Sequence, residues 1–504
     1  MIENLGLLLD GFTAALAPHH LVWIIAGTVM GVVIGALPGL GPTAGMAILL
    51  PVAFSMSPTS AIIMLGGIYY GAMYGGTITA VLLNIPGESD AVWTALEGHK
   101  LAKRGRAGAT MVIAAVASFF AGTTSLFLLA IAATILAGWA LSFGPVQLFT
   151  VLLLGLAMII GLNARAPAKG YLMLAVGLVI GCVGFDIITG SPRLTFGVDR
   201  LLDGIDFLPV TVGMFGLAEV FANVERRTGF ASTDEMRTNS LLPTRQEWRL
   251  SCWPAIRGTV LGFFVGIIPG TGTTIGATAS YALERRIARR PEAFGEGAIE
   301  GVAGPEAANN AVTAGAMVPI LSLGIPTTPA TAVLLGAMLM QGLRPGPLLF
   351  RNSPDVVWTF IGSMYIGNFI LLILTTLFIP VFTWLIYRSA NLINAIVIVF
   401  CIVGVYASRN AAFDVWIMLL FGVIGYLLGK FQYPTVPLIL GIVLGDAAEL
   451  TLRQSLIMSG GNPAVFFSDP ISATVLTLAL AVILWPLVRA ILHRRRVRQL
   501  AVAP

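Results

Sequence analysis

Long apolar runs separated by short polar loops dominate the chain. Such runs include residues 146–162, 171–188, 391–407, 415–428 and 471–488. Most of them approach the length of about 20 residues that an α-helix needs to cross the hydrocarbon core of a bilayer. Strands of a membrane barrel are shorter and alternate in polarity, which these runs do not do. The pattern therefore predicts an all-α integral membrane protein with about 10–12 membrane segments.

The composition supports the same fold class. Of the 504 residues, 57% are hydrophobic and only 11% are charged, whereas soluble domains carry about 25% charged residues. A chain so poor in charge is expected to have the lipid bilayer as its solvent over most of its surface. The net charge of +5 comes from basic residues in short loops. Membrane proteins carry basic residues in such loops, so the charge does not indicate nucleic-acid binding.

An apolar pattern interrupted by proline and glycine occurs twice in the chain. Residues 31–41 have the sequence GVVIGALPGLG, and residues 262–272 have the sequence GFFVGIIPGTG. A second element follows each of them, YGGTITAVLLNIPG at 74–87 and AGAMVPILSLGIPT at 314–327. Two matches in the same order indicate a duplicated unit.

The repeated Pro-Gly element predicts a helix that ends at membrane depth. Proline removes an amide donor and clashes with the preceding helical turn, and glycine adopts backbone angles that other residues avoid. Paired Gly/Pro interruptions in matching positions are typical of the binding site of a transporter. The alternative is that the glycines only allow close packing of helices. We expect four of them to do so in any case: Gly31, Gly35, Gly262 and Gly266.

Basic residues indicate which ends of the helices face the cytoplasm. No Lys or Arg precedes Lys100, and basic clusters then occupy 100–106, 226–257, 285–290 and 494–498. The second hairpin is therefore flanked by basic loops on both sides, whereas the first is flanked by none. This charge pattern predicts two inverted repeats whose re-entrant hairpins enter the membrane from opposite sides.

We expect the two repeats to divide the chain near its middle, with one hairpin and one broken helix in each half. The expected segments are a first half at 1–225 with a hairpin at 21–54 and a broken helix at 60–95, a cytoplasmic linker or interfacial segment at 226–257, a second half at 258–490 with a hairpin at 258–283 and a broken helix at 305–343, and a basic cytoplasmic tail at 491–504.

Polar residues gather at the interruptions, where we expect them to bind substrate and ions. Exposed amides at the starts of half-helices bind anions with help from the helix dipole, and threonine hydroxyls and asparagine amides add further donors. Backbone carbonyls and asparagine oxygens favour a candidate Na⁺ site near Asn84 and Ser322. The expected contacts to substrate or ion are Gly39, Gly41, Thr43, Asn84, Gly270, Thr271, Gly272, Thr273, Asn309, Asn310, Ser322 and Thr327.

Several carboxylates near apolar runs have a less direct interpretation. Glu88, Asp90 and Glu306 could cap helix starts at the membrane surface, or they could bind a coupling cation. Asp186 and Asp414 are expected to be solvated at helix ends. The chain has no phosphate-binding loop, and its cysteines have no metal-binding spacing. We therefore expect no enzyme activity, no catalytic residue, and no cofactor or metal other than the candidate Na⁺ ion.

One combination of motifs is specific. It comprises ALPGLGPTAG at 36–45, NIPG at 84–87 with ALEGHKLAKRGR at 95–106, IPGTGTTIG at 268–276, PEAANN at 305–310 and LGIP at 323–326. Together these motifs resemble the large membrane subunit of the tripartite tricarboxylate transporters, over most of the chain. The chain departs from the family pattern at Thr327-Thr328, where Gly-Ser is expected, and at Glu88, where a neutral residue is expected.

The resemblance implies a bacterial inner-membrane transporter that is driven by an ion gradient. Such systems have a small second membrane subunit and a periplasmic substrate-binding protein, and they import small carboxylates such as citrate and related acids. The expected function is therefore that of the translocation subunit of a Na⁺ or proton symporter for such carboxylates, with an elevator-like motion by analogy. The alternatives are a scaffold subunit, an exporter of organic anions and, as the least favoured, an intramembrane enzyme.

Overall fold

The computed structural model describes residues 2–37, 40–163, 167–186, 188–226, 242–377 and 379–485. These residues are helical almost throughout, and one short pair of strands accompanies the helices. The chain divides into two compact units, each built from two stretches of sequence. The larger unit contains Met1–Ala140 and Leu208–Leu427, and the smaller contains Leu141–Phe207 and Leu428–Pro504.

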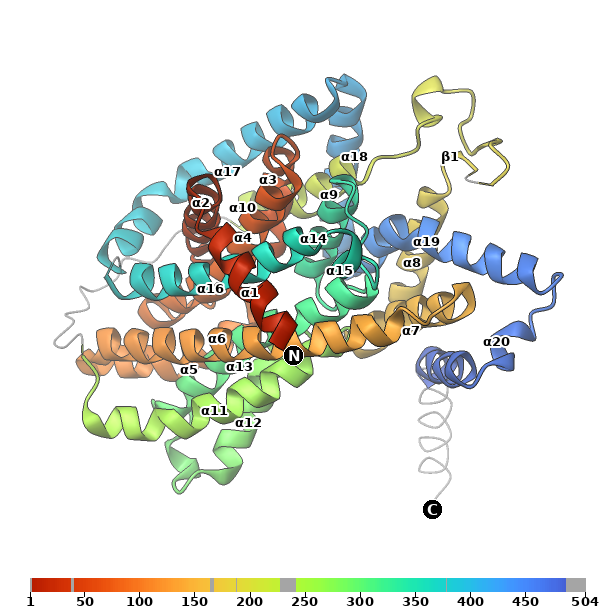
Figure 1. Cartoon of the computed structure of the whole chain (residues 1–504). Coiled ribbons are helices and arrows are strands. Elements are labelled where there is room, and N and C mark those ends of the chain that lie inside the picture. The colour runs from red at the N-terminus through yellow and green to blue at the C-terminus, as the bar shows by residue number, and fades with distance from the viewer. Residues whose placement is uncertain are drawn as a thin grey trace, which may run out of the picture. The chain divides into compact units, whose positions relative to one another are not determined.

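The larger unit carries both of the repeated sequence elements. Figure 1 shows its helices α11, α12 and α13 packed side by side. Its elements are α1 (Ile2–Ala15), α2 (Pro18–Gly35), α3 (Pro42–Phe54), α4 (Pro58–Leu83), η1 (Ser89–Ala91), α5 (Val92–Leu101), η2 (Ala102–Arg106), α6 (Ala107–Ala140), α9 (Phe207–Thr211), η4 (Val212–Leu217), α10 (Ala218–Arg226), α11 (Arg245–Ile267), α12 (Gly272–Ile287), η5 (Pro291–Ala293), α13 (Glu300–Leu323), α14 (Pro329–Met340), α15 (Leu349–Asn352), α16 (Pro354–Leu377), α17 (Ile379–Arg409) and α18 (Ala412–Lys430).

Many of these helices are apolar enough to lie in a membrane. Among the described residues, seven helical stretches are also long enough to cross one: Pro18–Gly35, Pro58–Leu83, Ser89–Ala140, Phe207–Glu225, Arg245–Ile267, Pro354–Thr376 and Ala412–Lys430. Shorter apolar helices, such as Pro42–Phe54 and Pro329–Met340, accompany them. The prediction of an all-α, multi-pass membrane protein is confirmed. The number of membrane segments and the inverted orientation of the repeats stay predictions.

Two helix pairs, one in each half of the chain, approach each other closely along rows of glycine. Helix α2 packs on α4, and α11 packs on α13. A Cβ atom at Gly31 would lie 2.7 Å from the backbone oxygen of Ile68, and one at Gly266 would lie 2.5 Å from that of Val312. Small residues at such positions let two helix backbones come together. Larger residues would therefore push these helices apart.

Local sequence explains where the helices of the larger unit begin. The hydroxyl of Ser57 accepts a hydrogen bond from the amide of Ser60 and caps α4. Thr244 and Glu247 form a capping box at the start of α11, in which each side chain accepts a bond from the backbone amide of the other. Such a box satisfies two amides that the helix leaves unpaired. Helix α11 therefore begins inside the stretch 226–257, for which we expected a linker or an interfacial segment.

The smaller unit combines apolar helices with a strand hairpin. Helix α19 packs on α7 and α8, and β1 pairs antiparallel with β2, with Gly184 opposite Arg193. The elements of this unit are α7 (Pro145–Asn163), α8 (Pro167–Gly181), β1 (Gly184–Phe185), β2 (Pro192–Arg193), η3 (Asp199–Leu201), α19 (Val436–Met458) and α20 (Val465–Ser468).

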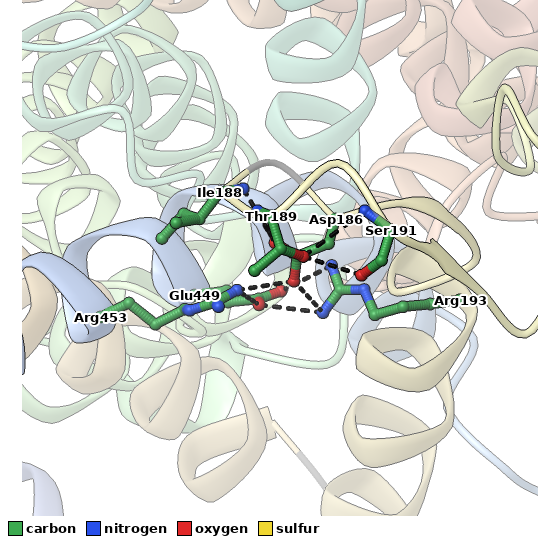
Figure 2. Close-up of polar contacts among 7 residues, drawn as sticks. All are labelled: Asp186, Ile188, Thr189, Ser191, Arg193, Glu449 and Arg453. Atoms are coloured by element: carbon green, nitrogen blue, oxygen red, sulfur yellow. Dashed lines mark hydrogen bonds and ion pairs between the residues drawn. The ribbon is translucent and has the colours of Figure 1, made fainter.

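A network of four charged side chains holds this hairpin to α19 (Figure 2). One carboxylate oxygen of Asp186 accepts a bond from Arg453 at 2.7 Å and lies 3.4 Å from Arg193. Glu449 accepts bonds from both arginines, at 2.8 Å from Arg453 and 3.0 Å from Arg193. The other oxygen of Asp186 accepts the backbone amide of Thr189 at 2.6 Å. Asp186 is only 6% exposed, so the expectation that it is solvated at a helix end is wrong.

Acid is expected to loosen the hairpin. The backbone amide of Thr189 and the guanidinium of Arg453 hold the pKa of the Asp186 carboxyl well below its usual range. Such a carboxyl stabilises the fold above its unfolded-state pKa of about 3.9, and this contribution is lost as the pH falls through the folded-state pKa. Hydrogen-exchange protection factors of residues 184–193 should therefore fall progressively as the pH drops from about 5 toward about 1. In the Asp186→Asn variant, the protection factors of these residues should be lower at neutral pH and should change less as the pH falls.

The neighbouring 3-10 helix η3 offers a control for this pH dependence. Asp199 begins that helix, and Asp199→Asn should leave the acid-induced loss of protection as it is in the wild type. If the Asp186→Asn variant lost as much protection in acid as the wild type, a group other than Asp186 would be responsible for the pH dependence.

Candidate functional site

The two repeated Ile-Pro elements lie where long helices are interrupted. Helices α4 and α13 each end at a residue in the left-handed conformation, Asn84 with φ 56° and Gly324 with φ 71°. Glycine and asparagine are the residues that adopt this conformation most readily. Helical structure begins again with η1 in the first half and with α14 in the second. We name the non-helical residues 84–88 break 1 and residues 324–328 break 2.

Each break contacts the tip of the hairpin in its own half. The backbone amide of Gly270, between α11 and α12, donates to the carbonyl oxygen of Thr327 at 3.0 Å. Gly270 has φ 83°, a conformation that favours glycine. In the first half, Gly41 lies against Glu88, because a Cβ atom at Gly41 would overlap the carboxylate of that residue. In each half, the hairpin tip and the break therefore lie side by side.

Beyond each break, the chain crosses to the hairpin of the other half. In the first half, the hydroxyl of Ser89 in η1 lies 2.7 Å from that of Thr274 in α12. In the second half, α14 packs on α3 and α4, and the side chain of Gln341 donates to the backbone oxygen of Ala53 at 2.7 Å. The two halves therefore interlock around the two breaks.

Tyr69 of α4 and Asp90 of η1 make further contacts across the halves. The hydroxyl of Tyr69 lies 3.4 Å from that of Thr328, which caps α14 through a capping box with Thr331. Asp90, just after break 1, lies close to Thr273 at the start of α12. Polar groups from both halves thus meet near the breaks.

A buried carboxylate, Glu306, bonds to residues on both sides of break 1. It lies within α13, which begins at Glu300, and it is 2% exposed. One of its oxygens accepts a bond from Thr77 of α4 at 2.8 Å, and the other accepts a bond from Thr94 of α5 at 2.5 Å. Of the two interpretations of Glu306, capping of a helix start at the membrane surface is therefore excluded.

Other predicted ligand residues are buried nearby. The amide nitrogen of Asn309 donates to a backbone oxygen of α4 at 3.4 Å, and that of Asn310 donates to the backbone oxygen of Glu306 at 3.2 Å. Among the described residues, the side-chain oxygens of Asn309 and Thr327 and one carboxylate oxygen of Asp90 have no hydrogen-bond partner. Buried polar atoms are normally hydrogen-bonded, so these oxygens are available to a bound substrate or ion.

The predicted residues at the hairpins lie at the starts of two helices. Gly41 and Thr43 at α3 are half-buried, as are Gly272 and Thr273 at α12. The first amides of a helix have no partner within it, so both helix starts offer donors to an anion. Gly39 lies outside the described residues.

Two predicted hydroxyls already have partners in their own segments. Thr271 donates to the backbone oxygen of Val265 at 2.6 Å, and Ser322 donates to that of Val318 at 2.5 Å. Of the residues suggested for Na⁺, Asn84 is exposed and Ser322 is fully buried. Within the described ranges, no group of three or more His, Cys, Asp or Glu side chains could hold a metal ion.

A second buried carboxylate, Glu97, joins α5 to the loop before α13. It is fully buried. It accepts a bond from the hydroxyl of Tyr281 at 2.6 Å and from the backbone amides of Gly295, Gly297 and Ala298 at 2.5, 2.7 and 2.8 Å. This arrangement fixes a helix of the first half to a loop of the second, and we call it the Glu97 clip.

Sequence reasoning did not find Tyr69, Thr77 or Thr94. Each lies in an apolar or glycine-rich stretch, and each contacts a residue more than 200 positions away, such as Glu306 for the two threonines. The only available signal was the presence of polar residues within apolar helices.

An all-α membrane fold in which two broken helices meet around buried polar groups is the architecture of a membrane transport protein. The model of the tripartite tricarboxylate transporter TctA family matches residues 21–440. The chain belongs to this family, and it is a transport component rather than an enzyme.

Two proteins of Agrobacterium vitis are similar to the chain. One, described as an uncharacterized 52.8 kDa protein in the TAR-I ttuC′ 3′ region, is 42% identical over 495 residues, which are 98% of each chain. The other, described as an uncharacterized protein in the TAR-II ttuC′ 3′ region, is 38% identical over 234 residues, which are 46% of this chain and 97% of the relative. No solved structure matches the chain.

Proposed function

We propose that the chain is the translocation subunit of a secondary transporter that imports small organic carboxylates, such as citrate-like di- and tricarboxylates. The substrate would bind between the two breaks and the starts of α3 and α12. The observation that carries this proposal is the contact between hairpin tip and broken helix, made by Gly270 and Thr327 at 3.0 Å. Irregular backbone at membrane depth is tolerated where it is enclosed by protein or lines a cavity.

The chemistry of this region suits an anion and a cation together. Amides at the starts of α3 and α12 and the hydroxyls of Thr273 and Thr327 can donate to carboxylate oxygens, aided by the helix dipoles. The unpartnered oxygens of Asp90 and Asn309 accept bonds and therefore favour a cation. Symport of a carboxylate with Na⁺ or a proton accounts for both kinds of group.

We further infer the partners and the motion from family membership and the fold. Membership of a tripartite transporter family favours two partners for the chain, a small second membrane subunit and a periplasmic substrate-binding protein. It also favours the bacterial inner membrane as the location of the chain. Delivery by a binding protein favours import. Because the Glu97 clip joins the two interlocked halves, they would move as one body, as an elevator-like mechanism requires.

Replacing Thr327 by valine is expected to reduce substrate uptake. The change removes one buried hydroxyl and keeps the size of the side chain. Loss of a hydrogen bond to a charged group costs about 1.5–3 kcal/mol, which corresponds to a loss of affinity of about 10- to 100-fold. The measurement is uptake of radiolabelled citrate, a dicarboxylate and an aromatic acid into vesicles. The vesicles contain the chain, its small membrane partner and the cognate binding protein, with and without a Na⁺ or proton gradient.

Thr259→Val is the matched control for this experiment. Thr259 is 2% exposed, like Thr327, but its hydroxyl donates to the backbone oxygen of Ala255 within α11 at 2.7 Å. The control should retain uptake. Wild-type uptake by the Thr327→Val variant would contradict the assignment of the site and favour a scaffold role for the chain. Efflux of the carboxylate in the absence of the binding protein would favour an exporter.

A further inference from the structure

Glu306 is enclosed between two buried threonines beside the proposed substrate site. Thr77 and Thr94, the two hydroxyl partners of its carboxylate, are fully buried, and Glu306 itself is 2% exposed. Thr77 precedes break 1 on α4, and Thr94 follows it on α5. The two hydrogen bonds of Glu306, at 2.8 and 2.5 Å, therefore hold together the two ends of the broken helix.

No basic side chain forms an ion pair with Glu306 within the described part of the chain. The ionisable groups that face it from neighbouring elements are Asp90 of η1 and Tyr74 of α4. Helices α6 and α14 contribute none. An ionised carboxylate in this position has no counter-charge and lies near a second carboxylate, which is costly in a membrane interior.

Several charged groups on the helices packed against α13 have partners of their own, and Arg249 of α11 and Arg285 and Arg286 of α12 are exposed, whereas Glu306 is buried. Arg257 of α11 binds Glu284 of α12 at 2.8 Å, and Lys100 of α5 binds Glu296 at 3.0 Å. The carboxylate of Glu97 is used by the Glu97 clip. None of these groups is therefore free to neutralise Glu306.

The partners of Glu306 suit a proton better than a metal ion. Each oxygen of its carboxylate faces a threonine hydroxyl, and a hydroxyl can donate or accept. A protonated carboxyl needs one acceptor and one donor, so rotation of a single hydroxyl accommodates the added proton without movement of heavier atoms. A Na⁺ ion would require several more oxygen ligands around the same carboxylate.

We propose that Glu306 is the site that carries the coupling proton of this transporter. The proton adds to one carboxylate oxygen on the outer side of the membrane and leaves the same oxygen on the inner side, and no other bond forms or breaks. Because Glu306 bonds to a residue on each side of break 1, its protonation changes the hydrogen bonds that link α4 to α5 across that break. This inference rests on the proposed function as a secondary transporter.

The test replaces Glu306 by glutamine in the assembled complex in proteoliposomes. Glutamine has the same shape and can bond to both threonines, but it cannot take up a proton. In the wild type, an inward gradient of one pH unit should raise the accumulation of labelled citrate by up to about tenfold per coupled proton. In Glu306→Gln, accumulation should no longer respond to the gradient. Exchange of internal unlabelled citrate for external labelled citrate should continue.

A second measurement does not depend on net transport. Addition of citrate to the detergent-solubilised complex, followed with a pH indicator in weak buffer, should cause proton uptake in the wild type and none in Glu306→Gln. Glu284→Gln is the matched control, because Glu284 is also 2% exposed but is paired with Arg257. The control should retain both proton uptake and the response to the gradient.

The outcomes separate this proposal from the function on which it rests. Accumulation that still follows the proton gradient in Glu306→Gln would overturn the assignment, as would loss of exchange in a folded complex, which would place Glu306 in the substrate site. Wild-type uptake that follows a Na⁺ gradient and ignores a proton gradient would overturn proton coupling and leave the transport function intact. Absence of uptake of any carboxylate by the folded wild-type complex would overturn the proposed function itself.

Discussion

Replacing Gly266 by valine is expected to prevent the larger unit from folding stably. A Cβ atom there would lie 2.5 Å from the backbone oxygen of Val312 and 3.0 Å from Cα of Gly315. Both contacts are to backbone, so no side chain can rotate away, and α11 and α13 must separate. Overpacking of a well-packed interior typically costs about 1–3 kcal/mol, and we expect about 3 kcal/mol here. The measurement is the yield of monodisperse protein in detergent and its thermal unfolding midpoint.

Gly138→Val is the control for this prediction. Gly138 lies on α6 with no atom within 4 Å of the position of an added Cβ, so the same substitution should change the midpoint little. A normal yield and midpoint for Gly266→Val would show that the two helices can separate without loss of stability.

Replacing Glu97 by alanine is the second change with a large expected effect. It removes the carboxylate of the Glu97 clip and leaves the amides of Gly297 and Ala298 and the hydroxyl of Tyr281 without their acceptor. An unsatisfied buried donor costs about 1–3 kcal/mol, so the free energy of unfolding should fall by about 4 kcal/mol. Thermal unfolding measures the loss, and faster hydrogen exchange at residues 294–298 locates it.

Glu296→Ala distinguishes the clip from surface charge in the same loop. Glu296 pairs with Lys100 at 3.0 Å, and both side chains are exposed. Exposed ion pairs contribute at most about 1 kcal/mol, so this variant should unfold close to the wild-type midpoint. Equal losses from the two variants would contradict a special role of the clip.

The interrupted helices were predictable because their cause is local. Proline and glycine act on their own turn of backbone, so Ile85-Pro86 and Ile325-Pro326 indicated the two breaks without any knowledge of the fold. The close approach at Gly31 and Gly266 was predictable for the same reason. The start of α11 was not, because an Arg-rich stretch resembles a loop until the capping box formed by Thr244 and Glu247 is recognised.

The partners of the buried carboxylates could not be predicted. Glu306 and Thr94 are 212 positions apart in the chain, and a single sequence contains no information about which distant groups meet. The prediction that Asn84 contacts a ligand also overlooked its backbone. Its left-handed conformation ends α4, and this supplies a structural reason for asparagine at that position.

The interlocking of the halves also sets an order of events during synthesis. Helix α5 is made long before α12 and the loop that receives Glu97, so the carboxylate of Glu97 has no hydrogen-bond donors from that loop while the intervening residues are still being added. Helix α14 instead finds α3 and α4 already made when it leaves the ribosome. The first half therefore remains incompletely packed until the second half has been made. The region around the two breaks closes only after α14 has been inserted.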